Sequence, residues 1–165
     1  MKVRWQFIWA VSAIAGLAVI GLPASAEKDE KGFVRFTPEE VEWKSPLGVG
    51  IQVAVLQGDP SKPGSMYVQR VKFPPGMFST PHYHPEDRFV TVIKGTWYSG
   101  TGEEFDPAKT VPLKPGGFMM HPARAVHWDG PKDEEVIVQI IGVGPGDTIP
   151  VRPEGGRFIS IKSKE

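Results

Sequence analysis

Apolar residues recur along the chain in short runs, and no stretch after the first 26 residues keeps helical spacing for three turns. Short β-branched and aromatic runs predict strands. The predicted strands are residues 51–56, 67–73, 89–94, 96–99, 118–121, 136–141 and 158–161. One short helix is expected over residues 38–43, because Thr37 can cap it and Glu40 follows at the capping-box spacing. The pattern predicts an all-β sandwich or barrel.

The first 26 residues have the pattern of a secretory signal peptide. Lys2 and Arg4 form a positive start, residues 7–22 are almost entirely apolar, and Ala24-Ser25-Ala26 is a small-x-small cleavage site. The apolar run is slightly short for a membrane span, which needs roughly 17 residues or more. We therefore favour cleavage after Ala26 over a membrane anchor. This predicts a periplasmic or secreted protein, without a stable membrane anchor, whose residues 27–165 form a single domain.

Composition narrows the function classes. The 165 residues include 19 basic and 19 acidic side chains and no cysteine. The balanced charge argues against a nucleic-acid partner, which favours a basic excess. The lack of cysteine excludes disulfides and thiolate catalysis. Glycine and proline, at 19 and 17 residues, supply turns between the strands.

Three of the four histidines form a candidate metal site. His82 and His84 flank Tyr83, and on a strand two residues with this spacing point to the same face. An antiparallel barrel can bring His127, at the end of another strand, to the same point. Neutral imidazole is the commonest metal ligand, and a three-histidine face leaves coordination positions open. The alternative is a pair of solvated histidines at a strand end.

The spacing around these histidines resembles the two sequence motifs of the cupin superfamily, small β-barrels related to germins. The segments that carry the resemblance are GDPSKPG at 58–64, HYHPED at 82–87, VTVIKGTW at 90–97 and the Pro-Ala and His segment at 122–127. The resemblance implies a double-stranded β-helix, the cupin jelly-roll barrel. It also implies a divalent transition metal (Fe, Mn, Ni or Zn) with His82, His84 and His127 as its ligands.

The sequence departs from this motif at Arg88. The resemblance places a metal-ligating Glu at this position, four residues after the second histidine, and here an arginine replaces it. At about 5 Å and an effective dielectric near 20, Coulomb's law gives a repulsion on the order of 7 kcal/mol between the guanidinium and a divalent ion. Three alternatives follow. Arg88 turns away to pair with Glu86 or Asp87 while the metal stays; an anionic substrate bridges metal and guanidinium; or a metal-free cationic pocket remains.

Further site residues are expected around this centre. Glu86 is a candidate optional ligand or proton carrier, and Arg88 a candidate anchor for a substrate carboxylate. Trp97, Phe118 and Gln139 are candidate substrate-binding residues, the aromatics because small-ligand sites often contain them and Gln139 because a polar residue in an apolar strand needs a partner. His121 is either a substitute ligand or an exposed or supporting histidine, and we favour the second interpretation.

The favoured function is an exported metal-dependent enzyme, a dioxygenase or isomerase, that acts on a small and anionic organic substrate. The alternative is a metal-free barrel that binds an organic acid or sugar, with Arg88 in place of the metal-ligating Glu. A third hypothesis is a structural barrel with a degenerate site. Exposed sheet edges also make a homodimer a reasonable expectation.

Overall fold

The computed structural model describes residues 29–35 and 37–161. The predicted signal peptide, residues 1–26, lies outside the described residues. Among the described residues, none belongs to a helix long and apolar enough to cross a membrane. The described chain consists of antiparallel strands and two short 3-10 turns, η1 (Pro38–Glu40) and η2 (Pro153–Gly155).

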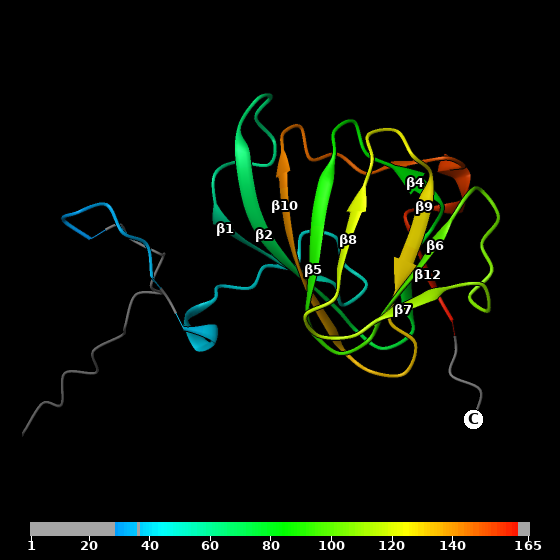
Figure 1. The fold of residues 1–165 in the computed structure, drawn as a ribbon. Helices are drawn as coiled ribbons and strands as arrows, with labels where there is room; N and C mark the ends of the chain where they lie inside the picture. Colours follow the sequence, from blue (N-terminus) through cyan, green and yellow to red (C-terminus); the bar gives the residue numbers. More distant parts are fainter. Residues whose placement is uncertain (1–28, 36, 162–165) are drawn as a thin grey trace, which may run out of the picture.

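Two five-stranded sheets build the barrel (Figure 1). The first sheet has the order β1 (Gln52–Gln57), β2 (Met66–Phe73), β10 (Val136–Val143), β5 (Arg88–Lys94) and β8 (Phe118–His121). The second has the order β11 (Ile149–Pro150), β4 (His82–Tyr83), β9 (His127–Gly130), β6 (Trp97–Thr101) and β7 (Val111–Leu113). A third, two-stranded sheet pairs β12 (Phe158–Ser160) with β3 (Met77–Ser79). This is the all-β architecture that the apolar pattern predicts.

Alternation of side chains creates the core between the two sheets. Along β10, Val136, Val138 and Ile140 are buried, while the residues between them are at least partly exposed. Such alternation places one face of a strand inward and the other outward. Buried Val90 and Val92 of the neighbouring β5 join the same core. The first sheet therefore supplies much of the apolar interior.

The seven predicted strands all occur, with ends shifted by at most two residues. The additional strands β3, β4, β7, β9 and β11, each of four residues or fewer, were not among the predicted ranges. The helix predicted over 38–43 is wrong in length: only η1 forms. Glu40 Oε2 does accept a hydrogen bond from the Thr37 amide at 2.6 Å. The backbone then becomes extended at Val41, whose side chain is buried.

Candidate metal centre

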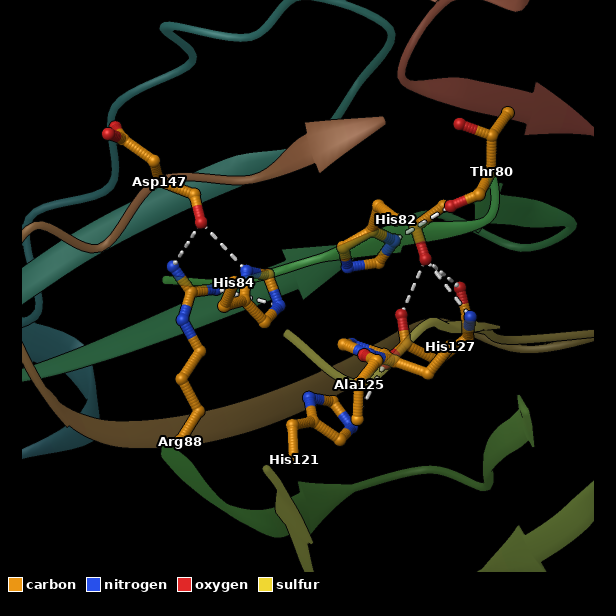
Figure 2. Close-up of polar contacts among 10 residues, drawn as sticks. Thr80, His82, His84, Arg88, His121, Ala125, His127 and Asp147 are labelled. Atoms are coloured by element: carbon orange, nitrogen blue, oxygen red, sulfur yellow. Dashed lines mark hydrogen bonds and ion pairs between the residues drawn. The ribbon is translucent and has the colours of Figure 1, made fainter. Parts of the chain in front are cut away.

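The barrel interior holds all four histidines of the chain, which we call the histidine cluster: His82, His84, His121 and His127. Each is at most 7% exposed. His82 begins β4 and lies directly opposite His127, which begins β9. Their ring centroids are 4.3 Å apart, and the His84 ring lies 4.8 Å from that of His82 and 5.0 Å from that of His127 (Figure 2). The convergence expected from the sequence is present.

The three predicted ligands hold their rings in the form that binds metals. Ligand atoms of His82, His84 and His127 all lie within 4.8 Å of one another. In each ring Nδ1 faces a backbone carbonyl; the carbonyls are those of Thr80, Asp147 and Ala125, at 2.7, 2.8 and 3.0 Å respectively. A carbonyl oxygen only accepts, so Nδ1 carries the hydrogen and Nε2 has a lone pair. Metal-ligating histidines are commonly oriented in this way.

Burial favours the uncharged form of three rings of the cluster, those of His82, His84 and His121. Removal from water lowers the pKa of His82 to about 4 and the pKa of His121 to about 3. The pKa of His84 is lowered by the same burial and by the neighbouring Arg88 charge. Neutral imidazole is the form that coordinates metals. These rings therefore need no deprotonation before an ion binds at neutral pH.

Arg88 begins β5 and points into the barrel, where it is only 6% exposed. Its Nη1 donates a hydrogen bond to His84 Nε2 at 3.3 Å. Its Nη2 donates to the carbonyl oxygens of Gly146 and Asp147. In the described part of the chain Arg88 has no ion pair with a carboxylate. The alternative in which Arg88 turns away to pair with Glu86 or Asp87 is therefore wrong.

A buried carboxylate, Asp129, also belongs to the site and was missed in the sequence. Its Oδ1 accepts a hydrogen bond from Ser79 Oγ at 2.6 Å. Its Oδ2 lies 3.5 Å from His121 Nε2 and 3.9 Å from His127 Nε2. Burial alone would raise the pKa of Asp129, but the adjacent His127 and the hydrogen bond from the Ser79 hydroxyl hold that pKa below its ordinary value. The available signal was its position two residues after His127, on the same face of β9.

A cavity of about 340 Å³ opens beside these groups. Its polar lining includes His82, His84, Arg88, His121 and Asp129. The predicted substrate-binding Trp97 also lines the cavity, yet it belongs to the apolar core, where its ring meets Phe73 edge-on at 4.7 Å. His121 also lines the cavity and is buried, so the expectation of an exposed histidine is wrong.

Three predicted site residues do not reach the cavity. Glu86 is exposed because the chain bends at Pro85 and Glu86, which breaks the strand parity that linked Glu86 to the histidines. Phe118 is 59% exposed, since His121 faces inward and the residue three positions earlier on β8 faces outward. Gln139 points away from the core between buried Val138 and Ile140, and it accepts a hydrogen bond from Arg70 Nε at 3.2 Å.

Comparison with known proteins identifies the fold. Neither a family model nor a curated protein matches this sequence. Among solved structures, the polyketide cyclase RemF from Streptomyces resistomycificus is 14% identical, with a TM-score of 0.59 over 73% of this chain and 86% of that one. The DMSP lyase DddQ from Ruegeria pomeroyi is 19% identical, with a TM-score of 0.56 over 71% of this chain and 64% of that one.

A third similar structure, an RmlC-like cupin from Ralstonia eutropha, is 18% identical, with a TM-score of 0.54 over 76% of this chain and 74% of that one. The sheet order, the jelly-roll interior and these similarities agree with the resemblance seen in the sequence motifs. The chain has the cupin fold, with a group of buried histidines that could hold a metal ion.

Proposed function

We propose that the protein is an exported enzyme that holds a divalent transition metal in the histidine cluster and acts on a small anionic organic molecule, with oxidoreductase chemistry. The observation that carries this proposal is the convergence of the oriented imidazoles of His82 and His84 with a buried guanidinium in one cavity. A second cavity, which is lined by residues such as Tyr83, Glu103 and Arg124, contains none of these groups.

The donor set of the cluster fits a metal ion. His127 Nε2 and both nitrogens of His121 are buried and have no hydrogen-bond partner among the described residues. Buried polar atoms without partners are rare and call for an explanation, such as an ion. Imidazole nitrogen suits iron, nickel and zinc, and a carboxylate such as that of Asp129 suits manganese. Such an ion supplies Lewis-acid or redox chemistry when bound.

Arg88 supports the proposal that the substrate is anionic. A buried charge is costly unless it is paired, and backbone carbonyls engage only part of the guanidinium. The N–H donors that these bonds leave free suit a carboxylate. Because Nη1 contacts His84, a carboxylate bound to Arg88 would hold the rest of its molecule next to the histidine cluster. The cavity, at about 340 Å³, falls in the size range of small-ligand sites.

One observation favours a second candidate function, a metal-free barrel that binds an organic acid. Arg88 Nη1 donates to His84 Nε2, and this bond occupies the lone pair that His84 would offer to an ion. In that case Arg88 alone would define the ligand, and the histidines would only shape the pocket.

Thermal unfolding with a model dicarboxylate tests the anion site. Succinate is expected to raise the melting temperature of the wild type, whereas succinamide, which has the same skeleton without charge, is not. Arg88→Gln should lose this response. Arg70→Gln is the matched control, because Arg70 lies on the outer face of the first sheet and bonds Gln139.

The same experiment separates the two candidates. If chelation removes the response to succinate and added Mn²⁺ or Zn²⁺ restores it, the metal-dependent function is supported. A response that survives chelation in metal-free protein would favour the metal-free barrel. The absence of any response in the wild type, with and without metal, would reject an anionic ligand at Arg88.

Export and self-association are further parts of the proposal. We expect mass spectrometry of the protein recovered from the periplasm or medium to show a mature chain that begins at Glu27. A chain that retains residues 1–26 would contradict cleavage. The homodimer stays a prediction, and light scattering at the mass of one chain would reject it.

A further inference from the structure

A second group of buried ligands overlaps the predicted histidine triad. Ligand atoms of His121, His127 and Asp129 all lie within 4.8 Å of one another. His121 ends β8 in the first sheet, while His127 and Asp129 share one face of β9 in the second. The group therefore spans the barrel interior from one sheet to the other.

The predicted triad of His82, His84 and His127 is compromised by Arg88. Both nitrogens of His84 are already engaged, Nδ1 with the Asp147 carbonyl and Nε2 with the Arg88 guanidinium. An ion at His84 would have to displace this guanidinium and would also face its positive charge. Like charges at such short range repel strongly in a buried site.

Asp129 offers a free ligand atom, which His84 lacks. Its Oδ1 is held by Ser79, which leaves Oδ2 directed toward the two imidazoles at 3.5 and 3.9 Å. Metal–ligand bonds of about 2.1 Å in tetrahedral geometry place ligand atoms roughly 3.4 Å apart. The observed separations need only a small closure to reach this geometry.

The ring nitrogens without hydrogen-bond partners also support a cation site between His121, His127 and Asp129. His127 Nε2 and both ring nitrogens of His121 have no hydrogen-bond partner within the described chain, and each residue is more than nine-tenths buried. These nitrogens and Asp129 Oδ2 converge without a hydrogen bond between them, and a cation bound between them would account for this arrangement.

We infer that the divalent cation binds to His121, His127 and Asp129, a two-histidine, one-carboxylate set, and that Arg88 with His84 forms the adjoining anion subsite. Asp129 then restores the negative charge that is lost where arginine replaces the family's Glu. Such a set leaves coordination positions open for a substrate. The inference rests on the proposed metal binding and names its ligands.

Titration with Co²⁺, followed by calorimetry and by visible absorption of the bound ion, tests the ligand set. Asp129→Asn and His121→Leu are each expected to weaken Co²⁺ binding by more than the roughly 10- to 100-fold that loss of a supporting residue costs. His84→Ala should leave the visible spectrum of bound Co²⁺, which reports its ligands, unchanged. Asp133→Asn, an exposed carboxylate on the turn before β10, is the matched control.

Further measurements distinguish a folding defect from failure of the ligand assignment and from failure of the proposed metal function. Asparagine keeps the Oδ1 that accepts from Ser79 Oγ, and circular dichroism with thermal unfolding checks that each variant is folded. If the wild type binds Co²⁺ but only His84→Ala abolishes binding, the inference is overturned while the proposed metal function stands. If the folded wild type binds no Co²⁺ at all, both fall.

Discussion

The two ends of the barrel interior differ in character, and β5 runs through both. Its inward residues are Arg88, Val90 and Val92. Arg88 is paired in register with His121 and contacts His84, whereas Val92 is paired with Val138 inside the apolar core. Successive inward positions along one strand therefore change from a buried charge at Arg88 to packed aliphatic side chains at Val90 and Val92.

The two ends of the barrel interior have different roles. At the apolar end, Phe73 and Trp97 are in ring contact. The buried Trp97 Nε1 also has no hydrogen-bond partner among the described residues, but an indole N–H is only a donor and cannot bind an ion. At the polar end, buried nitrogens of His121 and His127 have no partner among the described residues. Proteins commonly depart from ideal packing at functional sites and compensate elsewhere. We expect stability to come mainly from the apolar end and ligand binding from the polar end.

Trp97→Ala should produce the largest effect, because Trp97 is 2% exposed and packs against Phe73. Truncation of a buried tryptophan leaves a cavity and lowers the free energy of unfolding by about 3–5 kcal/mol. Urea denaturation measures this change. Trp43→Ala is the control, since Trp43 is only partly buried and has Lys72 over its ring at 4.3 Å. Equal losses in the two variants would contradict the account.

Acid should lower the free energy of unfolding of the metal-free protein, because buried histidines at the polar end resist protonation. The pKa of His82 is about 4 and that of His121 about 3 in the folded state, below the ordinary 6.5. The unfolded chain therefore binds more protons below pH 6.5, and the free energy of unfolding falls as pH decreases.

This fall is about 1.4 kcal/mol per pH unit for each such histidine. Urea denaturation between pH 7 and pH 5 in the presence of a chelator measures it. The slope should be smaller in His121→Leu, which has one titrating ring less. Stability that stays constant over this range would contradict the buried, neutral state of the cluster.

His121→Leu should stabilise the metal-free protein. The substitution removes two buried nitrogens that have no hydrogen-bond partner in the described structure, each a cost to folding. We expect the free energy of unfolding to rise by about 1 kcal/mol. His82→Leu is the matched comparison and should destabilise, because it leaves the Thr80 carbonyl without its donor. If His121→Leu is as destabilising as His82→Leu, the polar end is a structural network.

Gln139→Ala should have the smallest effect. Gln139 lies on the outer face of the first sheet and bonds Arg70. Surface substitutions of this kind change stability by about 0.5 kcal/mol or less. The response of the melting temperature to succinate should be unchanged. Loss of that response would mean that the outer face takes part in ligand binding.

Sequence reasoning reached most of the fold and part of the site. Long strands such as β10 were predictable because alternation continues over many residues, and the convergence of His82 with His127 followed from spacing and motif order. Strand parity failed for Glu86, since it assumes an unbroken strand and the chain bends there. Parity alone also could not assign His121 to the interior, because the inward face is fixed only by the partner strands. Asp129 was missed because a two-residue spacing from a histidine has no distinctive pattern.

The central claim is that the polar end of the barrel is a metal centre. The most direct measurement is the metal content of the protein after reconstitution with Mn²⁺ or Zn²⁺ and removal of unbound ions. Inductively coupled plasma mass spectrometry determines this content. We predict close to one equivalent of metal in each wild-type chain, and far less in Asp129→Asn. A content near zero in folded wild-type protein would contradict the claim.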